Sequence, residues 1–182
     1  MEEIKRIGRT LKYEGAIVDV YSDSIQMPDG RVAEWDYIAH RKGAAAVVAV
    51  TPEGKILMVH QYRNALDRMT IEIPAGARDS VTEDTMVCAI RELEEETGYR
   101  AGHMEKLLSL KTTVAFCNEF IDVYLATELT PGRQNLDPDE YIDVHAYDPD
   151  ELLSMIYQGK IQDSKTVSGI LAYCYQKGNK IR

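Results

Sequence analysis

The stretch Arg91-Glu92-Leu93-Glu94-Glu95-Glu96-Thr97-Gly98 is the most informative part of this chain. Glu92 is followed by Glu95 at i+3 and by Glu96 at i+4, so on a helix these three carboxylates share one side. Like charges at this spacing cost about 0.2–0.5 kcal/mol per pair, and anions near a helix C-terminus also oppose the helix dipole. A divalent cation would remove both penalties, and a set of oxygen ligands favours Mg²⁺ or Mn²⁺ over zinc.

The residues around this stretch predict one amphipathic helix. Ser80, followed three residues later by Glu83, fits the capping-box pattern of a helix N-terminus, and Thr82 is an alternative N-cap. Gly98 is the expected residue just beyond the C-terminus. Apolar residues at helical spacing are expected to face the core: Met86, Ala89, Ile90 and Leu93. Glutamate-rich helices are more often simply solvated, so a metal site needs support from the rest of the sequence.

Turn sequences and apolar runs predict a sheet with strands on both sides of this helix. Strands are expected over residues 16–21, 31–40, 44–50, 55–62, 70–76, 107–112, 120–126 and 141–147. Helices are expected over residues 148–157 and 163–176. This order predicts an α/β (α+β) chain in which a mixed sheet packs between helices, with an antiparallel hairpin at the N-terminus.

Composition narrows the class of protein. The chain has 182 residues, of which 45% are hydrophobic and 28% charged, as in a globular domain that buries a core of its own. Neither a signal peptide nor a long apolar span is found, and the three widely spaced cysteines are expected to be reduced, which indicates a cytoplasmic protein. A net charge of −9 argues against a nucleic-acid partner.

From Glu83 onward the chain resembles the Nudix family. In that family's motif a glutamate is followed, after seven residues, by Arg-Glu, an apolar residue, any residue, Glu-Glu, any residue, Gly and an apolar residue. Glu83 and the stretch Arg91–Tyr99 match every one of these positions. Gly76 matches the glycine that opens the motif but lies one residue further from Glu83, so the loop over residues 77–82 is expected to be longer by one residue.

The segments Glu72–Gly76 and Gln61–Arg63 extend this resemblance to the ADP-ribose pyrophosphatase branch, over residues 43–151. The resemblance implies a metal-binding set of the Ala75 carbonyl, Glu92, Glu95 and Glu96. It also implies that a later loop supplies another acid, which Glu140 matches best. Pro138 stands where some relatives have a second glutamate, so Glu140 and a glutamate of the motif are alternatives for the base that activates water.

Arg91 has two interpretations, contact with the diphosphate or hydrogen bonds to carboxylates of the motif. The second is favoured because Glu94 and Glu95 are its helical neighbours at i+3 and i+4. Arg63, at the end of a strand, is expected to contact the diphosphate, and its alternative is a surface ion pair.

Glu72 and Trp35 are further candidates for substrate contacts. Glu72 either binds a ribose hydroxyl or is an ordinary glutamate at a strand edge. Trp35 is the only tryptophan, and its default interpretation is a core anchor. The alternative for Trp35 is stacking on the adenine, across a dimer interface. The four histidines are given no role.

The sequence thus predicts a Mg²⁺-dependent hydrolase, with Mn²⁺ as a substitute, that cleaves the pyrophosphate bond of ADP-ribose or a related ADP-sugar into AMP and a sugar phosphate. Residues 43–182 are expected to form the Nudix domain, and residues 1–42 an extension for dimerisation and substrate contacts. The resemblance implies a homodimer. The alternatives are hydrolysis of another nucleoside diphosphate derivative and a non-catalytic nucleotide-sugar sensor, and the number of metal ions is left open.

Overall fold

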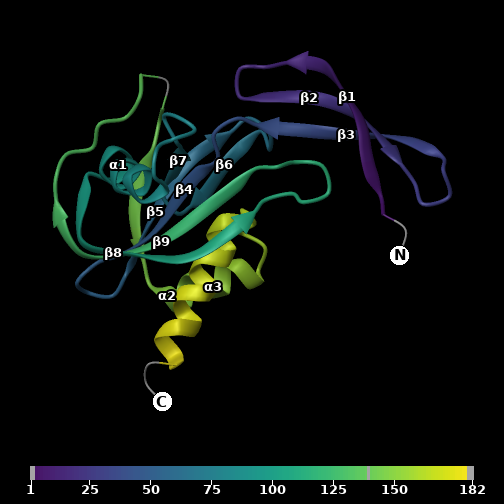
Figure 1. Cartoon of the computed structure of the whole chain (residues 1–182). Coiled ribbons are helices and arrows are strands. Elements are labelled where there is room, and N and C mark those ends of the chain that lie inside the picture. Colours follow the sequence, from purple (N-terminus) through teal and green to yellow (C-terminus); the bar gives the residue numbers. More distant parts are fainter. Residues whose placement is uncertain (1–2, 139, 180–182) are drawn as a thin grey trace.

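The computed structural model describes residues 3–138 and 140–179, and it contains a small N-terminal sheet beside a larger α+β body (Figure 1). The small sheet has the strand order β1 (Lys5–Glu14), β2 (Val18–Gln26) and β3 (Val32–His40), all antiparallel. The predicted hairpin is confirmed as β2 and β3. Strand β1 was not predicted, because nearly all of its side chains are exposed and no alternation of apolar and polar residues marks it.

The larger sheet has seven strands and is mixed, as the sequence predicts. Its strands are β4 (Ala44–Val50), β5 (Ile56–Arg63), β6 (Arg68–Glu72), β7 (Ala75–Ala77), β8 (Tyr99–Lys111), β9 (Phe120–Pro131) and β10 (Asp143–Tyr147). The order is β10-β5-β4-β9-β8, with β6 paired to β5 and β7 paired to β4. Only the pair β4–β9 is parallel. Strand β8 begins eight residues earlier than predicted, because a register shift between Lys106 and Leu108 breaks the alternation that marks a strand.

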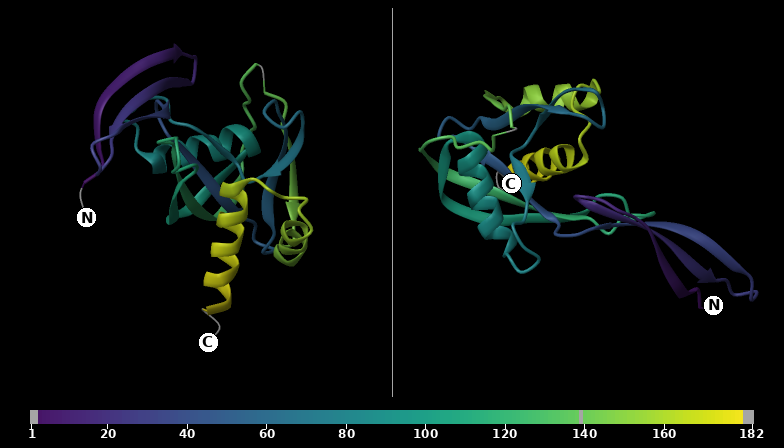
Figure 2. Two further views of the ribbon diagram at one scale, coloured as in Figure 1. Left: turned by 90° about the vertical axis from the view of Figure 1, so that its right-hand side faces the viewer. Right: turned by 90° about the horizontal axis from the view of Figure 1, so that it is seen from above.

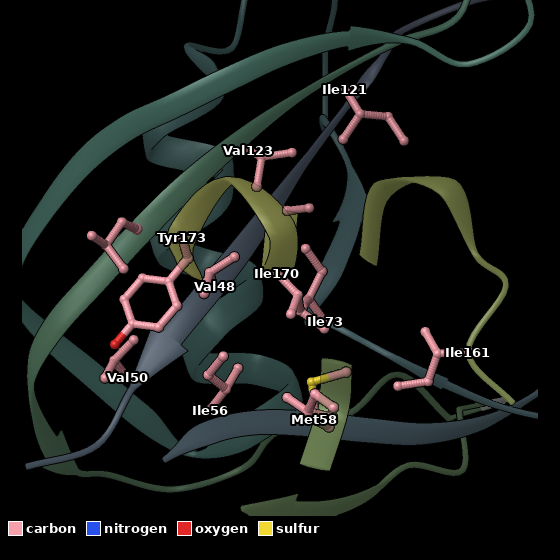
Figure 3. Close-up of a cluster of buried hydrophobic side chains, with 13 residues drawn as sticks. Val48, Val50, Ile56, Met58, Ile73, Ile121, Val123, Ile161, Ile170 and Tyr173 are labelled. Carbon is pink, nitrogen blue, oxygen red and sulfur yellow. The ribbon is translucent and has the colours of Figure 1, made fainter. Parts of the chain in front are cut away.

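Helices cover both faces of this sheet (Figure 2). Helix α1 (Thr85–Thr97) packs on one face, and α2 (Pro149–Tyr157) and α3 (Ser164–Asn179) pack on the other. Strand β4 lies between them, so its alternate side chains enter two separate cores. Val48 and Val50 face α3 in the core drawn in Figure 3, whereas Val47 faces α1. Burial on both faces explains why this strand is a continuous apolar run rather than an alternating one.

Helix α1 begins later than the capping-box pattern predicts. Asp84 is its N-cap, and the Asp84 carboxylate accepts a hydrogen bond from the Met86 N–H at 2.8 Å. Ser80 and Thr82 are therefore not helix caps. Ser80 Oγ does accept from the Glu83 N–H at 3.1 Å, but these contacts close a tight turn that precedes the helix. A capping box and an isolated turn use the same local hydrogen bond, so the sequence alone does not distinguish them.

The apolar face predicted for α1 is half right. Ala89 and Leu93 are fully buried, but Met86 and Ile90 are exposed. The buried side of the helix instead includes three polar residues, Glu92, Glu96 and Thr97, beside Cys88, Ala89 and Leu93. Two glutamates, Glu92 and Glu96, are therefore buried on the side of the helix that packs against the sheet, and their burial marks the site described below.

The N-terminal sheet is attached to the body through β3. The Ile38 N–H donates to the Phe116 carbonyl at 2.7 Å, and the His40 N–H donates to Asn118 Oδ1 at 2.7 Å. The sheet projects beyond this attachment (Figure 2), and Trp35 on β3 is half exposed, so the prediction that Trp35 anchors the core of this chain is wrong. Among the helices that the structure describes, none is long and apolar enough to cross a membrane. The three cysteines are free thiols, as expected.

Two adjacent residues of α3 provide a test of this packing. Ile170 is fully buried against the sheet, whereas Leu171 is 38% exposed. We expect Ile170→Ala to lower the free energy of unfolding by about 2–5 kcal/mol, because the substitution opens a cavity in the core. Leu171→Ala should cost less than about 1 kcal/mol. Urea unfolding followed by circular dichroism measures both, and equal losses would contradict the assigned face of α3.

Candidate active site

The C-terminal turns of α1 and the loop after β9 are held together by hydrogen bonds from the loop to backbone carbonyls of the helix. Gly98 ends the helix in a left-handed conformation with φ of 72°, and a Cβ there would lie 2.8 Å from the backbone nitrogen of Gln134. The Asn135 N–H donates to the Glu95 carbonyl at 2.9 Å, and Gln134 Nε2 donates to the Glu96 carbonyl at 2.7 Å. The loop that carries Glu140 is therefore fixed against the turn of the helix that carries the acids.

Glu92 and Glu96 are buried carboxylates on the same side of α1. Glu96 Oε2 accepts a hydrogen bond from the Ala75 N–H at 2.9 Å. Burial, together with the charges of Glu92 and Glu140, raises the pKa of Glu96 to about 8, against the opposing effect of the Ala75 N–H. Burial also raises the pKa of Glu92 to about 7, and the charges of Glu95 and Glu140 add to that rise. These carboxyl groups therefore lie within each other's electrostatic field, and without a cation they resist ionisation.

Gly76 allows the Glu92 carboxylate to approach the backbone of β7. A Cβ at this position would lie 2.1 Å from the carboxyl carbon of Glu92 and 2.2 Å from both of its oxygens. No side chain fits into that space, which gives the glycine of the segment Glu72–Gly76 a physical reason. The loop that follows is held by Arg91 Nη2, which donates to the Ala77 carbonyl at 3.1 Å.

Arg91 binds carboxylates of the motif, as favoured from the sequence. Its Nη1 donates to Glu92 Oε1 at 2.7 Å and to Glu95 Oε2 at 3.0 Å, and its Nη2 reaches Glu83 Oε2 at 3.5 Å. Glu94, which was the expected neighbour at i+3, instead pairs with Arg100. The guanidinium of Arg91 therefore offsets part of the repulsion among the acids when no cation is bound.

A cavity of about 290 Å³ lies over these acids. Five carboxylates and three cations line it, together with the backbone of the preceding loop: Lys42, Gly76, Ala77, Arg78, Asp79, Arg91, Glu92, Glu95, Asn135, Asp137 and Glu140. Glu140 is exposed in this cavity, and its carboxylate accepts a hydrogen bond from the Asp137 N–H at 3.3 Å. Glu140 thus shares one cavity with Glu92 and Glu95 of α1, which lie 48 and 45 residues before it in the sequence.

The donor set of this cavity fits a hard divalent cation. The ligands available are carboxylate and carbonyl oxygens, which Mg²⁺ and Mn²⁺ prefer, and burial raises the pKa of Glu92 and of Glu96. Within residues 3–138 and 140–179, no three His, Cys, Asp or Glu side chains already surround one point at coordination distance. A cation that enters must therefore compete with Arg91 for Glu92 and Glu95.

A larger cavity of about 530 Å³ adjoins the acidic one, and both include Gly76 and Ala77 in their walls. Its wall carries Arg63 and Glu72, which form a two-point ion pair with distances of 2.8 and 2.6 Å. Burial acts to raise the pKa of Glu72, but hydrogen bonds from Arg63 and Lys165 outweigh it and lower the pKa to about 2. Glu72 is therefore buried and ion-paired rather than an ordinary edge glutamate, and its contact with a ribose hydroxyl stays a prediction.

Lys165 and Asp163 complete this ion pair, and the sequence analysis did not identify either residue. Lys165 Nζ donates to Glu72 Oε2 and, at 3.0 Å, to Asp163 Oδ2. One signal was available, because Lys165 stands in the first turn of α3, where the helix dipole disfavours a cation. Of the other predicted residues, Arg63, Glu72 and Ala75 line the larger cavity, whereas Glu96 and Trp35 line neither cavity. His40, to which no role was assigned, also lines the larger cavity.

Comparison with known proteins assigns this arrangement to a family. The model of the NUDIX domain matches residues 40–168. A methanol dehydrogenase activator of Bacillus methanolicus is 40% identical over 170 residues, which cover 92% of this chain and 91% of that protein. An ADP-ribose pyrophosphatase of Bacillus subtilis (strain 168) is 36% identical with the same coverage.

Among solved structures, one described as an ADP compounds hydrolase superposes with a TM-score of 0.88 and covers 98% of this chain and 97% of its own. At 15% identity, that likeness establishes the fold alone. The family match extends over the strands, the helix α1 and the loops that build the acidic cavity. The chain therefore belongs to the Nudix family of hydrolases, as its sequence indicates.

Proposed function

We propose that this protein hydrolyses the diphosphate bond of ADP-ribose, or of a related ADP-sugar, and releases AMP and a sugar phosphate. The observation that carries the proposal is the pair of adjoining cavities. One gathers five carboxylates, and the other presents Arg63 and has room for a sugar or nucleoside. The name of the Bacillus subtilis relative supports the choice of ADP-ribose.

We further propose that Glu92, Glu95, Glu96 and the carbonyl of Ala75 hold Mg²⁺, for which Mn²⁺ is a substitute. When bound, the metal supplies positive charge that neutralises the diphosphate and acidifies water. The protein's own contribution is to keep Glu92 and Glu96 buried on one side of α1 and to hold the Glu96 carboxylate by the Ala75 N–H. In this proposal Arg91 orders the acids and does not contact the substrate.

Glu140 is our choice for the group that takes the proton from the attacking water. Glu95 is held by Arg91, whereas the Glu140 carboxylate has only the Asp137 N–H as a hydrogen-bond partner within the described residues. Water adds to one phosphorus, the bridging P–O bond breaks, and the bridging oxygen leaves on the other phosphate. Arg63 at the cavity wall would bind the diphosphate through the part of its guanidinium that faces the larger cavity.

A second candidate comes from the other relative, which is named as an activator of a dehydrogenase. The two names are compatible with one chemistry if the substrate is a dinucleotide whose diphosphate links adenosine to a second ribose. This second candidate function, hydrolysis of such a dinucleotide, is distinguished from hydrolysis of an ADP-sugar by the products released and by a coupled dehydrogenase assay.

The experiment that tests the proposal is a substrate panel with products resolved by chromatography. ADP-ribose, ADP-glucose, GDP-mannose and nicotinamide adenine dinucleotide are incubated with Mg²⁺, with Mn²⁺ and with EDTA. We expect AMP and ribose 5-phosphate from ADP-ribose when either metal is present and no turnover in EDTA. Faster turnover of another member would replace the substrate, and tight binding without turnover would indicate a sensor.

Glu96→Gln is predicted to lower the rate at least about 100-fold, because the variant loses a charged oxygen of the proposed metal site. Glu94→Gln is the matched control, since Glu94 lies on the same helix but pairs with Arg100 outside the cavity. We expect the control to keep the wild-type rate. Equal loss in both variants would show that the effect is on the helix rather than on the site.

The same variant has a pH-dependent consequence for stability in the metal-free protein. Because the pKa of Glu96 is raised from 4.5 to about 8, the folded state binds this proton more tightly than the unfolded state. Stability is therefore expected to fall as the pH rises from about 5 to about 8 in EDTA, and less so in Glu96→Gln. Thermal unfolding at both pH values measures this, and identical profiles would contradict it.

Residues 1–42 are proposed to form a homodimer contact and to bring Trp35 to the adenine of the neighbouring copy. The N-terminal sheet exposes an unusual number of large apolar side chains, which include Ile7, Leu11, Tyr13, Ile17, Val32 and Trp35. Trp35 lines neither cavity of its own chain, so the proposed contact requires a second copy.

Trp35→Ala should raise KM for ADP-ribose about 10-fold with little change in kcat, because stacking on a base is lost. Trp35→Phe, which keeps an aromatic ring, should restore most of the affinity. Light scattering is expected to give twice the chain mass. A monomer at micromolar concentration, with unchanged KM in Trp35→Ala, would refute this contact.

A further inference from the structure

Four charged side chains form a chain of ion pairs between the β5–β6 hairpin and the start of α3. Arg63 binds Glu72 through Nε and Nη2, and Lys165 binds Glu72 from the other side and Asp163 at 3.0 Å. Thr70 Oγ1 also donates to Glu72 Oε1 at 2.8 Å. The side chains of Glu72 and Lys165 are 2% and 8% exposed, so this central pair is screened from water, whereas Arg63 and Asp163 are partly exposed.

The two cations of the network are used differently. Arg63 is 40% exposed, and its hydrogen bonds to Glu72 leave Nη1 without a partner among the residues that the structure describes. Nη1 is therefore available to a ligand in the larger cavity. Lys165 uses two of its three ammonium hydrogens on the carboxylates of Glu72 and Asp163, and its role is to complete the surroundings of Glu72.

Glu72 depends on both cations. An ionised carboxylate that is buried needs its charge and its lone pairs matched, or the surroundings rearrange. If the lysine charge were removed, Arg63 would be the only cation left on Glu72, and Asp163 would lose its ion pair with Lys165. The guanidinium would then be drawn from its present position, because it would have to serve both acids.

The first turn of α3 also supports the segment that leads to the acidic cavity. Asp163 Oδ2 accepts from the Thr166 N–H at 3.0 Å and from Thr166 Oγ1 at 2.6 Å. Thr166 Oγ1 accepts in turn from the Ile73 N–H at 3.0 Å. Ile73 lies two residues before Ala75, whose N–H binds Glu96. The first turn of α3 thus contacts Glu72 at the larger cavity and Ile73 in the segment that leads to the acidic cavity.

We propose that Lys165 is a positioning residue for substrate binding, which acts through Glu72 to hold the Arg63 guanidinium at the diphosphate. This inference rests on the proposed function and adds to it a residue at the far end of the chain, near the boundary of the family match at residue 168. Lys165 need not touch the substrate in this role.

The first test separates binding from turnover. Lys165→Met removes the charge and keeps the aliphatic stem, Lys165→Arg keeps the charge, and Lys177→Met is the matched control on the same helix, where the lysine is exposed. We expect Lys165→Met to raise KM for ADP-ribose about 10- to 100-fold with kcat within about threefold of wild type. Lys165→Arg should recover most of that loss, and Lys177→Met should match wild type. An unchanged KM in folded Lys165→Met would overturn the proposal.

The second test asks whether Lys165 acts through Arg63. Arg63→Met and the double variant Arg63→Met/Lys165→Met should have the same KM, because the lysine has nothing left to position. If the two effects multiply instead, Lys165 contributes to binding on its own and the proposal is wrong. Should Lys165→Met fail to fold, Lys165→Gln, which keeps a hydrogen-bond donor but no charge, takes its place in both tests.

The third test does not depend on activity. The Nε–H signal of Arg63 in the nuclear magnetic resonance spectrum of the ligand-free protein should be sharp and slowly exchanging in wild type and in Lys165→Arg. It should be broadened or lost in Lys165→Met. A wild-type protein that cleaves no member of the substrate panel would refute the proposed function, whereas an Arg63 signal unaffected by Lys165→Met would refute the positioning role.

Discussion

The burial of Glu92 and Glu96 on α1 is the constraint on which the rest of the site depends. A helix that packs against a sheet normally presents aliphatic side chains, and here two of its inward positions are carboxylates whose pKa values lie near 7 and 8. Such positions lower the stability of the metal-free protein at neutral pH. They are tolerated for three reasons. Arg91 binds the Glu92 carboxylate, and the Ala75 N–H binds the Glu96 carboxylate. The absence of a side chain at Gly76 leaves room for Glu92.

The same constraint explains why the surrounding loops are attached so firmly. Hydrogen bonds from Gln134 and Asn135 close the end of α1, and these bonds determine where the chain emerges toward Glu140. On the other side, the segment from Ile73 to Ala75 is fixed by Thr166. The acids themselves repel one another, so their geometry is set by the Arg91 guanidinium and by the Ala75 N–H, not by mutual attraction.

Much of the fold and part of the site could be predicted from the sequence. The motif around Arg91 and Gly98 is local, because spacing along one helix decides which acids share a side. The apolar run at residues 44–50 and the turns beside it also specify strands through local chemistry. The start of α1 was misplaced because Ser80 and Glu83 make the hydrogen bond of a capping box without forming a helix. Trp35 was assigned to the core because burial follows residue type on average, and a projecting sheet is an exception.

The residues that could not be predicted are those whose meaning comes from contacts across the chain. Glu72 and Lys165 are 93 residues apart, and neither has a local pattern that names the other. A lysine in the first turn of a helix is locally unfavourable, and the conflict is resolved only when the helix is placed over a buried carboxylate. A residue that breaks a local rule without a local gain therefore points to a functional contact elsewhere in the fold. The two buried glutamates of α1 are further examples. By this reasoning Lys165 belongs with the residues that position Arg63 and not with the surface charges of α3.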